Sequence, residues 1–187
     1  MFSAVGVTCL SLEIDLKIIL AGILLGSLIG SIIALKVKMT AIPEMVALFN
    51  GFGGLATFLI AWSSFNEPSN SAFQHVLIML TIYIGGITFT GSLIAYGKLS
   101  EKLKLGKGSM ITNIFISFFY LSMPALIYVI AEPTISQFMP QVPSYFLIFL
   151  GITLIAGIGF VMPIGGGDMP VVISLLNSLS GIAAAFA

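Results

Sequence analysis

Charged residues are scarce in this chain, and arginine is absent altogether. Lysine and arginine together number 7 among 187 residues, all of them lysine, and aspartate and glutamate add another 7. A soluble domain carries about 25% charged residues, whereas this chain carries 7%. So few charges cannot cover a water-facing surface of this size, which excludes a soluble globular domain. The net charge of zero gives no reason to expect nucleic acid as a partner.

The residues that most often carry chemistry are also few. A single cysteine, Cys9, excludes a disulfide within the chain and a CxxC metal site. The only histidine is His75, which we predict at the outer end of a helix. It is either a solvated side chain at the membrane interface or a proton donor or acceptor, and the sequence leaves both interpretations open. The sequence has neither a phosphate-binding glycine loop nor a Ser/His/Asp arrangement. We therefore predict no catalytic residue, no metal site and no cofactor site on this chain.

Long apolar runs fill most of the sequence, and hydrophobic residues make up 58% of it. The runs are close to twenty residues long and do not alternate with polar residues, which predicts membrane-spanning helices rather than barrel strands. We predict an all-α integral membrane protein, a bundle of about six transmembrane helices with a parallel internal repeat. The outer N-terminal segment is 1–16 and the helical domain is 17–187. The predicted spans are about 17–35, 43–64, 74–96, 110–131, 145–165 and 170–187.

The lysines predict the orientation of these spans. Six of the seven fall in two loops that share one side if the spans alternate: Lys36, Lys38, Lys98, Lys102, Lys104 and Lys107. Cytoplasmic loops collect lysine and arginine. Only Lys17 falls on the other side, so we expect the N-terminus outside.

An internal repeat relates the second predicted span to the sixth. Pro43 corresponds to Pro170, Asn50 to Asn177 and Gly54 to Gly181 at one constant offset. Both spans start from the inside, so the repeat is parallel, and such repeats are common in transport proteins. Chance similarity between two apolar helices is the alternative, which the paired asparagines disfavour.

Each asparagine lies seven residues, or roughly 10 Å, beyond its proline, so the two amides share one depth inside the hydrocarbon. Polar groups at such depth usually face the bundle interior or a water-filled cavity. Three hydroxyls join them as candidates for a polar path: Thr88, Ser92 and Ser174. Interhelical hydrogen bonds between amides, and local bonds from hydroxyls to backbone carbonyls, are the alternatives.

An acid and three consecutive glycines precede the sixth span. Asp168 follows Gly165, Gly166 and Gly167 and comes just before Met169 and Pro170. An acid at this place suits a helix start and needs no further function. The three glycines suggest more, namely a hinge or docking site at the inner mouth.

Three segments together resemble a known family: 36–44 (KVKMTAIPE), 85–99 (GGITFTGSLIAYGKL) and 165–178 (GGGDMPVVISLLNS). The chain is similar to the membrane domain of the beta subunit of proton-translocating NAD(P) transhydrogenase, over about residues 18–187. The resemblance implies that proton entry drives hydride transfer from NADH to NADP+ between soluble domains. Asp168 matches the acid at the junction with the NADP-binding domain, and Asn177 matches a channel asparagine. Asn50 stands where the family usually has a channel histidine.

The resemblance also implies what surrounds this region. NAD and NADP belong to the assembled complex and have no site on this chain. The implied partners are membrane lipid, the alpha subunit, the NADP-binding domain and a second copy of the complex, in a bacterial inner membrane. Further helices and the soluble domain are expected after Ala187, so the chain looks truncated there. A small-solute transporter and a non-conducting partial transhydrogenase scaffold are the alternative functions.

Overall fold

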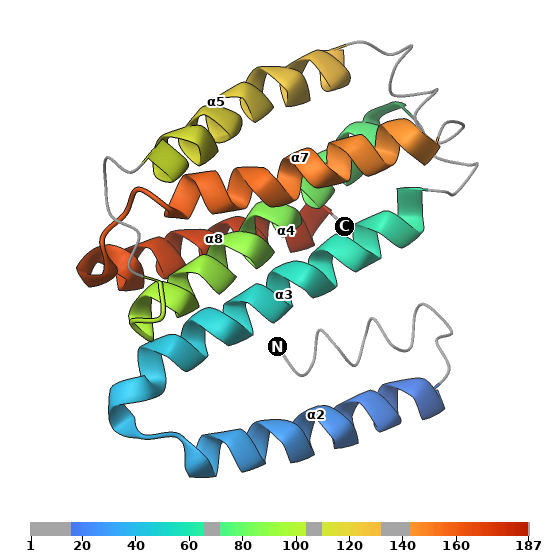
Figure 1. Cartoon of the computed structure of the whole chain (residues 1–187). Helices are drawn as coiled ribbons and strands as arrows, with labels where there is room; N and C mark the ends of the chain where they lie inside the picture. Colours follow the sequence, from blue (N-terminus) through green and yellow to red (C-terminus); the bar gives the residue numbers. More distant parts are fainter. Residues whose placement is uncertain (1–15, 66–71, 104–109, 132–142, 187) are drawn as a thin grey trace. The chain divides into compact units, whose positions relative to one another are not determined.

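The computed structural model describes residues 16–65, 72–103, 110–131 and 143–186, and every long element in those ranges is an α-helix. The helices are α2 (Leu16–Lys36), α3 (Ile42–Phe65), α4 (Ala72–Leu99), α5 (Met110–Ala131), α7 (Pro143–Val161) and α8 (Met169–Phe186) (Figure 1). Four of them, α2, α3, α4 and α8, are long and apolar enough to cross a membrane. The expectation of an all-α membrane protein is thereby confirmed. The predicted N-terminal segment 1–16 lies outside the described residues except for Leu16.

The chain divides into two units, Met1–Thr40 and Ala41–Ala187. In the first unit, α2 has no buried residue, and its exposed side chains are almost all apolar. Lys17 and Lys36 lie near its two ends. An apolar helix about 21 residues long, flanked by lysines, suits a single crossing of the hydrocarbon, because its side chains match the lipid and its charges reach the interfaces.

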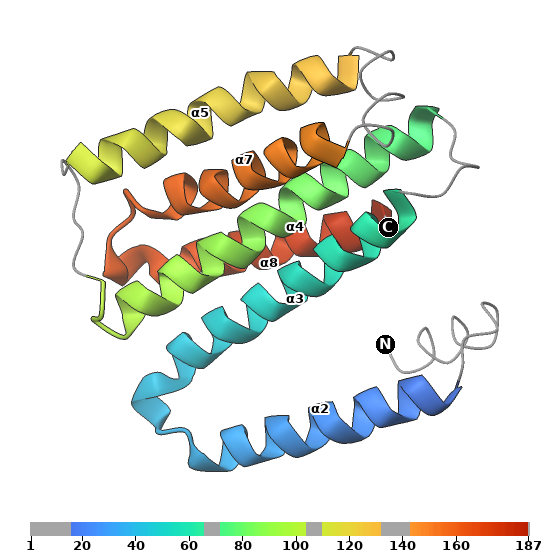
Figure 2. The ribbon, with the colours of Figure 1, turned by 45° about the vertical axis from the view of Figure 1, so that its right-hand side comes forward.

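The second unit is built around α4, which packs against α3 on one side and against α7 and α8 on the other. Helix α5 packs on the far side of α7, so it forms an outer layer of this unit (Figures 1 and 2). The largest fully buried side chains come from α4, α8 and the residues they touch: Met79, Ile82, Met169, Leu176 and Val161. Helix α4 is therefore the element of the second unit against which α3, α7 and α8 pack.

Glycines and small hydroxyl residues let these helices approach closely. A Cβ atom added at Gly54 of α3 would lie 2.9 Å from the backbone nitrogen of Phe89 and from Thr88 Cβ on α4. A Cβ at Gly157 of α7 would lie 2.5 Å from the carbonyl oxygen of Ile87. Small residues at such contacts are typical of membrane bundles. Gly151 of α7, by contrast, has open space around it.

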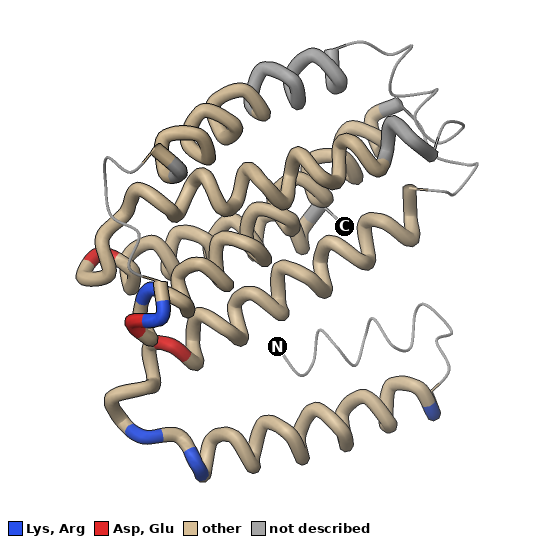
Figure 3. Tube along the Cα trace, viewed as in Figure 1, with Lys and Arg blue, Asp and Glu red and all other residues tan. Residues whose placement is uncertain are grey.

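Helices α3 and α8, the two copies of the sequence repeat, lie side by side and run in the same direction (Figures 1 and 2). A short 3-10 turn, η3 (Gly166–Asp168), leads directly into α8. The charged residues of the second unit that the structure describes gather at the end where α3 and α8 start (Figure 3). The two helices that carry the repeat asparagines are therefore neighbours, and both start at the charged end of the unit.

Candidate functional site

A groove of about 720 Å³ runs between α3 and α8. Five of its lining side chains are polar: Asn50, Thr57, Ser174, Asn177 and Ser180. The rest are apolar or glycine: Val46, Phe49, Gly53, Pro170, Ile173, Gly181 and Ala184. Because the membrane helices are mostly apolar, this concentration of amides and hydroxyls marks the groove as the candidate site.

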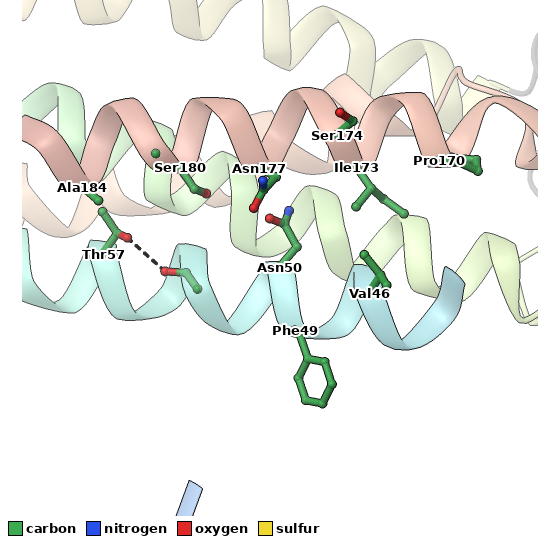
Figure 4. Close-up of a pocket in the computed structure, with 12 residues that line it drawn as sticks. Val46, Phe49, Asn50, Thr57, Pro170, Ile173, Ser174, Asn177, Ser180 and Ala184 are labelled. Atoms are coloured by element: carbon green, nitrogen blue, oxygen red, sulfur yellow. Dashed lines mark hydrogen bonds between the residues drawn. The ribbon is translucent and has the colours of Figure 1, made fainter. Parts of the chain in front are cut away.

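Helical spacing places these residues on one face of each helix. On α3, Thr57 follows Asn50 by seven residues, which is two turns. On α8, Ser174, Asn177 and Ser180 follow one another at intervals of three. Figure 4 shows the amides of Asn50 and Asn177 pointing toward each other across the groove. The repeat predicts that the two asparagines lie at equal depth, and their side chains also point into the same groove.

Helix α4 supplies the back of the site through Ser92. The side-chain nitrogen of Asn50 donates a hydrogen bond of 2.9 Å to the Ser92 hydroxyl, which is fully buried. Gly51 makes this approach possible, because a Cβ there would lie 3.2 Å from Ser92 Cβ. The bond fixes the Asn50 side chain by its nitrogen, so the amide oxygen is available to accept a bond from another group.

Two hydroxyl groups near the groove are buried and lack hydrogen-bond partners within the described part of the chain, those of Thr88 and Ser180. Ser180 lines the groove. Thr88 lies one turn before Ser92 on α4, packs beside Gly54 and is not part of the lining. Buried polar groups are normally bonded to protein or to ordered water. Each hydroxyl could therefore bond to a water molecule, one in the groove lining and the other on α4, one turn from Ser92.

The turn at residues 165–168, which we call the glycine turn, lies at the entrance to α8. The Asp168 amide donates a hydrogen bond of 3.1 Å to the Gly165 carbonyl, and the Asp168 side chain is exposed. Pro170 is two residues further on and lines the groove, so the turn borders one end of the groove. The structure therefore separates the predicted set. Asn50, Ser174 and Asn177 line the groove, Ser92 bonds to Asn50 from α4, Thr88 is not part of the lining, and the glycine turn with Asp168 lies at the end of the groove.

None of the three glycines in the turn is required by the described structure. A Cβ at Gly165 would come no closer than 4.0 Å to Asp168, a Cβ at Gly166 no closer than 3.9 Å to the Lys98 carbonyl, and one at Gly167 would meet nothing within 4 Å. All three have backbone conformations outside the left-handed region. Neither strain nor packing among the described residues explains why positions 165–167 of this turn are all glycine.

Lys98 is a residue whose role the sequence did not reveal. Counted as one of the lysines of the loop after the third span, it is instead buried, with only 9% of its surface exposed. Its ammonium donates to the carbonyl oxygens of Val161, at 3.4 Å, of Ile164, at 2.7 Å, and of Met162. Val161 is the last residue of α7, and Met162 and Ile164 belong to the short segment that leads from α7 to the glycine turn. Of the two lysines described in this region, Lys102 is the exposed one, and its ammonium lies 5.4 Å from the centre of the Tyr96 ring.

Thr57 and Ser180 are two groove residues that the sequence analysis did not single out. Their spacing from Asn50 and Asn177 was a signal available in the sequence, since both follow an asparagine at a helical interval. His75 takes no part in the groove lining. Its ring packs edge-on against Phe65, with centroids 6.3 Å apart, at the opposite end of α4 from Lys98.

Comparison with known proteins places the chain in a family. A family model described as the NAD(P) transhydrogenase beta subunit matches residues 1–187. Two curated relatives named NAD(P) transhydrogenase subunit beta, one from Rhodospirillum rubrum and one from a particular strain of that species, are each 35% identical over 164 residues. The alignment covers 82% of this chain and 34% of each relative, so the chain spans about a third of their length. The match over the whole chain, together with the helical membrane architecture, shows that this chain belongs to the NAD(P) transhydrogenase beta subunit family.

Proposed function

We propose that this chain is the proton-conducting membrane part of a transhydrogenase complex, in which proton passage is coupled to hydride transfer from NADH to NADP+ on soluble domains. The observation that carries the proposal is the groove between α3 and α8, where the two repeat asparagines face each other beside Ser92. Family membership supports the same assignment.

The groove suits protons that move along hydrogen-bonded water. Its volume of about 720 Å³ is many times the volume of about 30 Å³ that one water occupies in the liquid. Asn50, Ser174 and Asn177 can each donate and accept hydrogen bonds, so each can stand in a chain that passes a proton and then reorients. The buried hydroxyl of Ser180, without a described partner, is a natural bonding site for such water.

No groove-lining side chain can hold the proton itself. Asn50 stands where relatives of the family usually have a histidine, and an amide does not titrate in the physiological range, whereas a histidine does. Asn50 can position water but cannot store a proton. In this proposal the proton therefore travels between Asn50 and Asn177 on ordered water, or it rests on a titratable group that a partner subunit contributes.

The glycine turn is proposed as the place where the membrane part meets the NADP-binding domain. Its missing side chains have no explanation in the described residues, so close approach of another protein surface is the reason that fits them. Asp168 is exposed there and offers a carboxylate to a basic partner group. We propose Asp168 as the coupling residue and Gly165, Gly166 and Gly167 as the surface that permits the approach.

The setting of the complex follows from the same proposal. The chain would lie in a bacterial inner membrane with its N-terminus outside, assembled with the alpha subunit and the NADP-binding domain, in a dimer of the complex. NAD and NADP would bind to those soluble domains. The lysine distribution between the predicted loops supports the orientation.

The test is reconstitution of the complete complex containing this chain into sealed vesicles. Hydride transfer is followed by absorbance and internal pH by a trapped dye. We expect hydride transfer to change the internal pH, and a protonophore to abolish the change while hydride transfer continues. Hydride transfer with no pH change would contradict the proposal and favour the scaffold alternative. Vesicles that move a small solute without any hydride transfer would favour a transporter.

A further inference from the structure

The buried Lys98 at the end of α4 connects three parts of the structure: α4 itself, the segment after α7 and the glycine turn. Lys98 lies on the helix that carries Ser92, and its ammonium reaches the carbonyl of the last α7 residue, Val161, and carbonyls of the segment 162–164 between α7 and the glycine turn. The Lys98 backbone also borders the turn, since a Cβ at Gly166 would lie 3.9 Å from its carbonyl oxygen. The side chain of Lys98 thus bonds to the segment before the glycine turn, and its backbone lies beside Gly166 within the turn.

The bonding of the ammonium is complete and suited to its surroundings. An ammonium has three donors, and the three carbonyls of Val161, Met162 and Ile164 accept from it. Val161 is the last residue of α7, and a cation near the final carbonyls of a helix is favoured by the helix dipole. In the described part of the chain, these carbonyls rather than a carboxylate are its bonding partners. Removal of the ammonium would deprive the Met162 and Ile164 carbonyls of this donor, whereas the Val161 carbonyl also accepts from the Ile164 backbone amide.

Helix α4 connects this contact rigidly to the groove. Ser92, bonded to Asn50, precedes Lys98 by six residues, which is about 9 Å along a helix. We therefore expect a displacement of α4 at the groove to move the ammonium, which holds the segment between α7 and the glycine turn. The path consists of one helix and two sets of hydrogen bonds.

We propose that Lys98 is a positioning residue that holds the glycine turn at the end of α4. A displacement at the Asn50–Ser92 pair then changes the position of Asp168. The coupling part of this inference rests on the proposed function, whereas the mechanical part concerns this chain alone. Lys98 is not part of the groove lining; in this proposal it acts through the backbone of residues 161–164.

The first experiment measures the turn directly and needs no activity. Gly167→Cys is the label site, because a side chain there meets nothing within 4 Å in the described structure. Cys9→Ser removes the only native cysteine of this chain. A nitroxide on residue 167 of the complete complex should become more mobile when Lys98→Met is added, since methionine keeps the volume but provides no donors. Lys98→Arg should restore most of the order, and Lys102→Met is the matched control, because Lys102 is exposed at the same end of α4.

The second experiment compares protons moved with hydride transferred in vesicles without the spin label. A purely structural defect lowers both quantities in proportion to the folded complex, so their ratio is the informative readout. We expect Lys98→Met to lower the ratio by about 2- to 30-fold, the range expected of residues that link two sites. Lys98→Arg should recover it, and Lys102→Met should leave it unchanged.

The two measurements separate the ways in which the proposal can be wrong. Unchanged nitroxide mobility in Lys98→Met would overturn the holding role. Increased mobility with an unchanged ratio would overturn the coupling role. If the unmutated complex transfers hydride but moves no protons, the proposed function fails, and the mobility measurement alone then decides whether Lys98 holds the turn.

Discussion

The side-chain amide of Asn50 donates a hydrogen bond to the hydroxyl of Ser92, a residue 42 positions away on the neighbouring helix. The bond joins the first copy of the sequence repeat to α4, on which the second copy also packs. It leaves the oxygen of the Asn50 amide free to serve the groove, where Asn177 faces it (Figure 4). One side chain therefore connects the central helix with the groove.

Replacement of Asn50 by histidine should give the groove a group that can store a proton. An unperturbed histidine titrates at about pH 6.5, so Asn50→His should bring a new titration near neutral pH into the dependence of proton pumping on pH. The complete complex should stay active, because histidine can still bond to Ser92. A pH profile identical to that of the unmutated complex would show that protons do not pass residue 50.

Loss of the charge on Asp168 should weaken the link between the membrane part and the NADP-binding domain. We expect Asp168→Asn to lower proton pumping by about 2- to 30-fold and to alter the rate of NADP(H) release. Glu101→Gln is the matched control, since Glu101 is an exposed acid at the end of α4. If Asp168→Asn pumps and releases nucleotide normally, Asp168 is only a helix-start residue.

Adjacent glycines on α3 provide a test of the packing. A Cβ at Gly54 would press against Phe89 and Thr88 at 2.9 Å, whereas one at Gly53 meets nothing within 4 Å. Gly54→Ala should destabilise the bundle by about 1–3 kcal/mol through overpacking. Gly53→Ala should be neutral or stabilising by up to about 1 kcal/mol, because alanine favours helix. Thermal unfolding in detergent distinguishes them, and equal stabilities would contradict the contact between α3 and α4.

The orientation proposed from the lysines can be tested by chemical labelling. Single cysteines at Lys102 and Gly166 should be shielded from an impermeant thiol reagent in intact cells, and one at Asn70 should react. All three should react after permeabilisation, which controls for accessibility. Reaction at Lys102 in intact cells would reverse the orientation.

Hydropathy was sufficient to predict the helices, because an apolar run of twenty residues has few alternatives in lipid. The equal depth of Asn50 and Asn177 also followed from the repeat, since proline-to-asparagine spacing fixes height along a helix. Ser92 as the partner of Asn50 could not be predicted, because that pairing depends on how two helices are rotated about their axes. Lys98 was misassigned to a loop, since charge counting treats each lysine as solvated, whereas its acceptors come from residues more than 60 positions away.

Proton pumping by leucine variants of the two groove asparagines tests the central claim most directly. Asn50→Leu and Asn177→Leu remove the amides that would hold water and keep a similar volume. Asn113→Leu is the matched control, because Asn113 is an exposed amide on α5, away from the groove. In vesicles with the complete complex, we expect both groove variants to lose proton pumping by about tenfold or more, about 1.4 kcal/mol in barrier, and Asn113→Leu to pump normally. Normal pumping by Asn50→Leu and Asn177→Leu would contradict the account and place the proton path elsewhere.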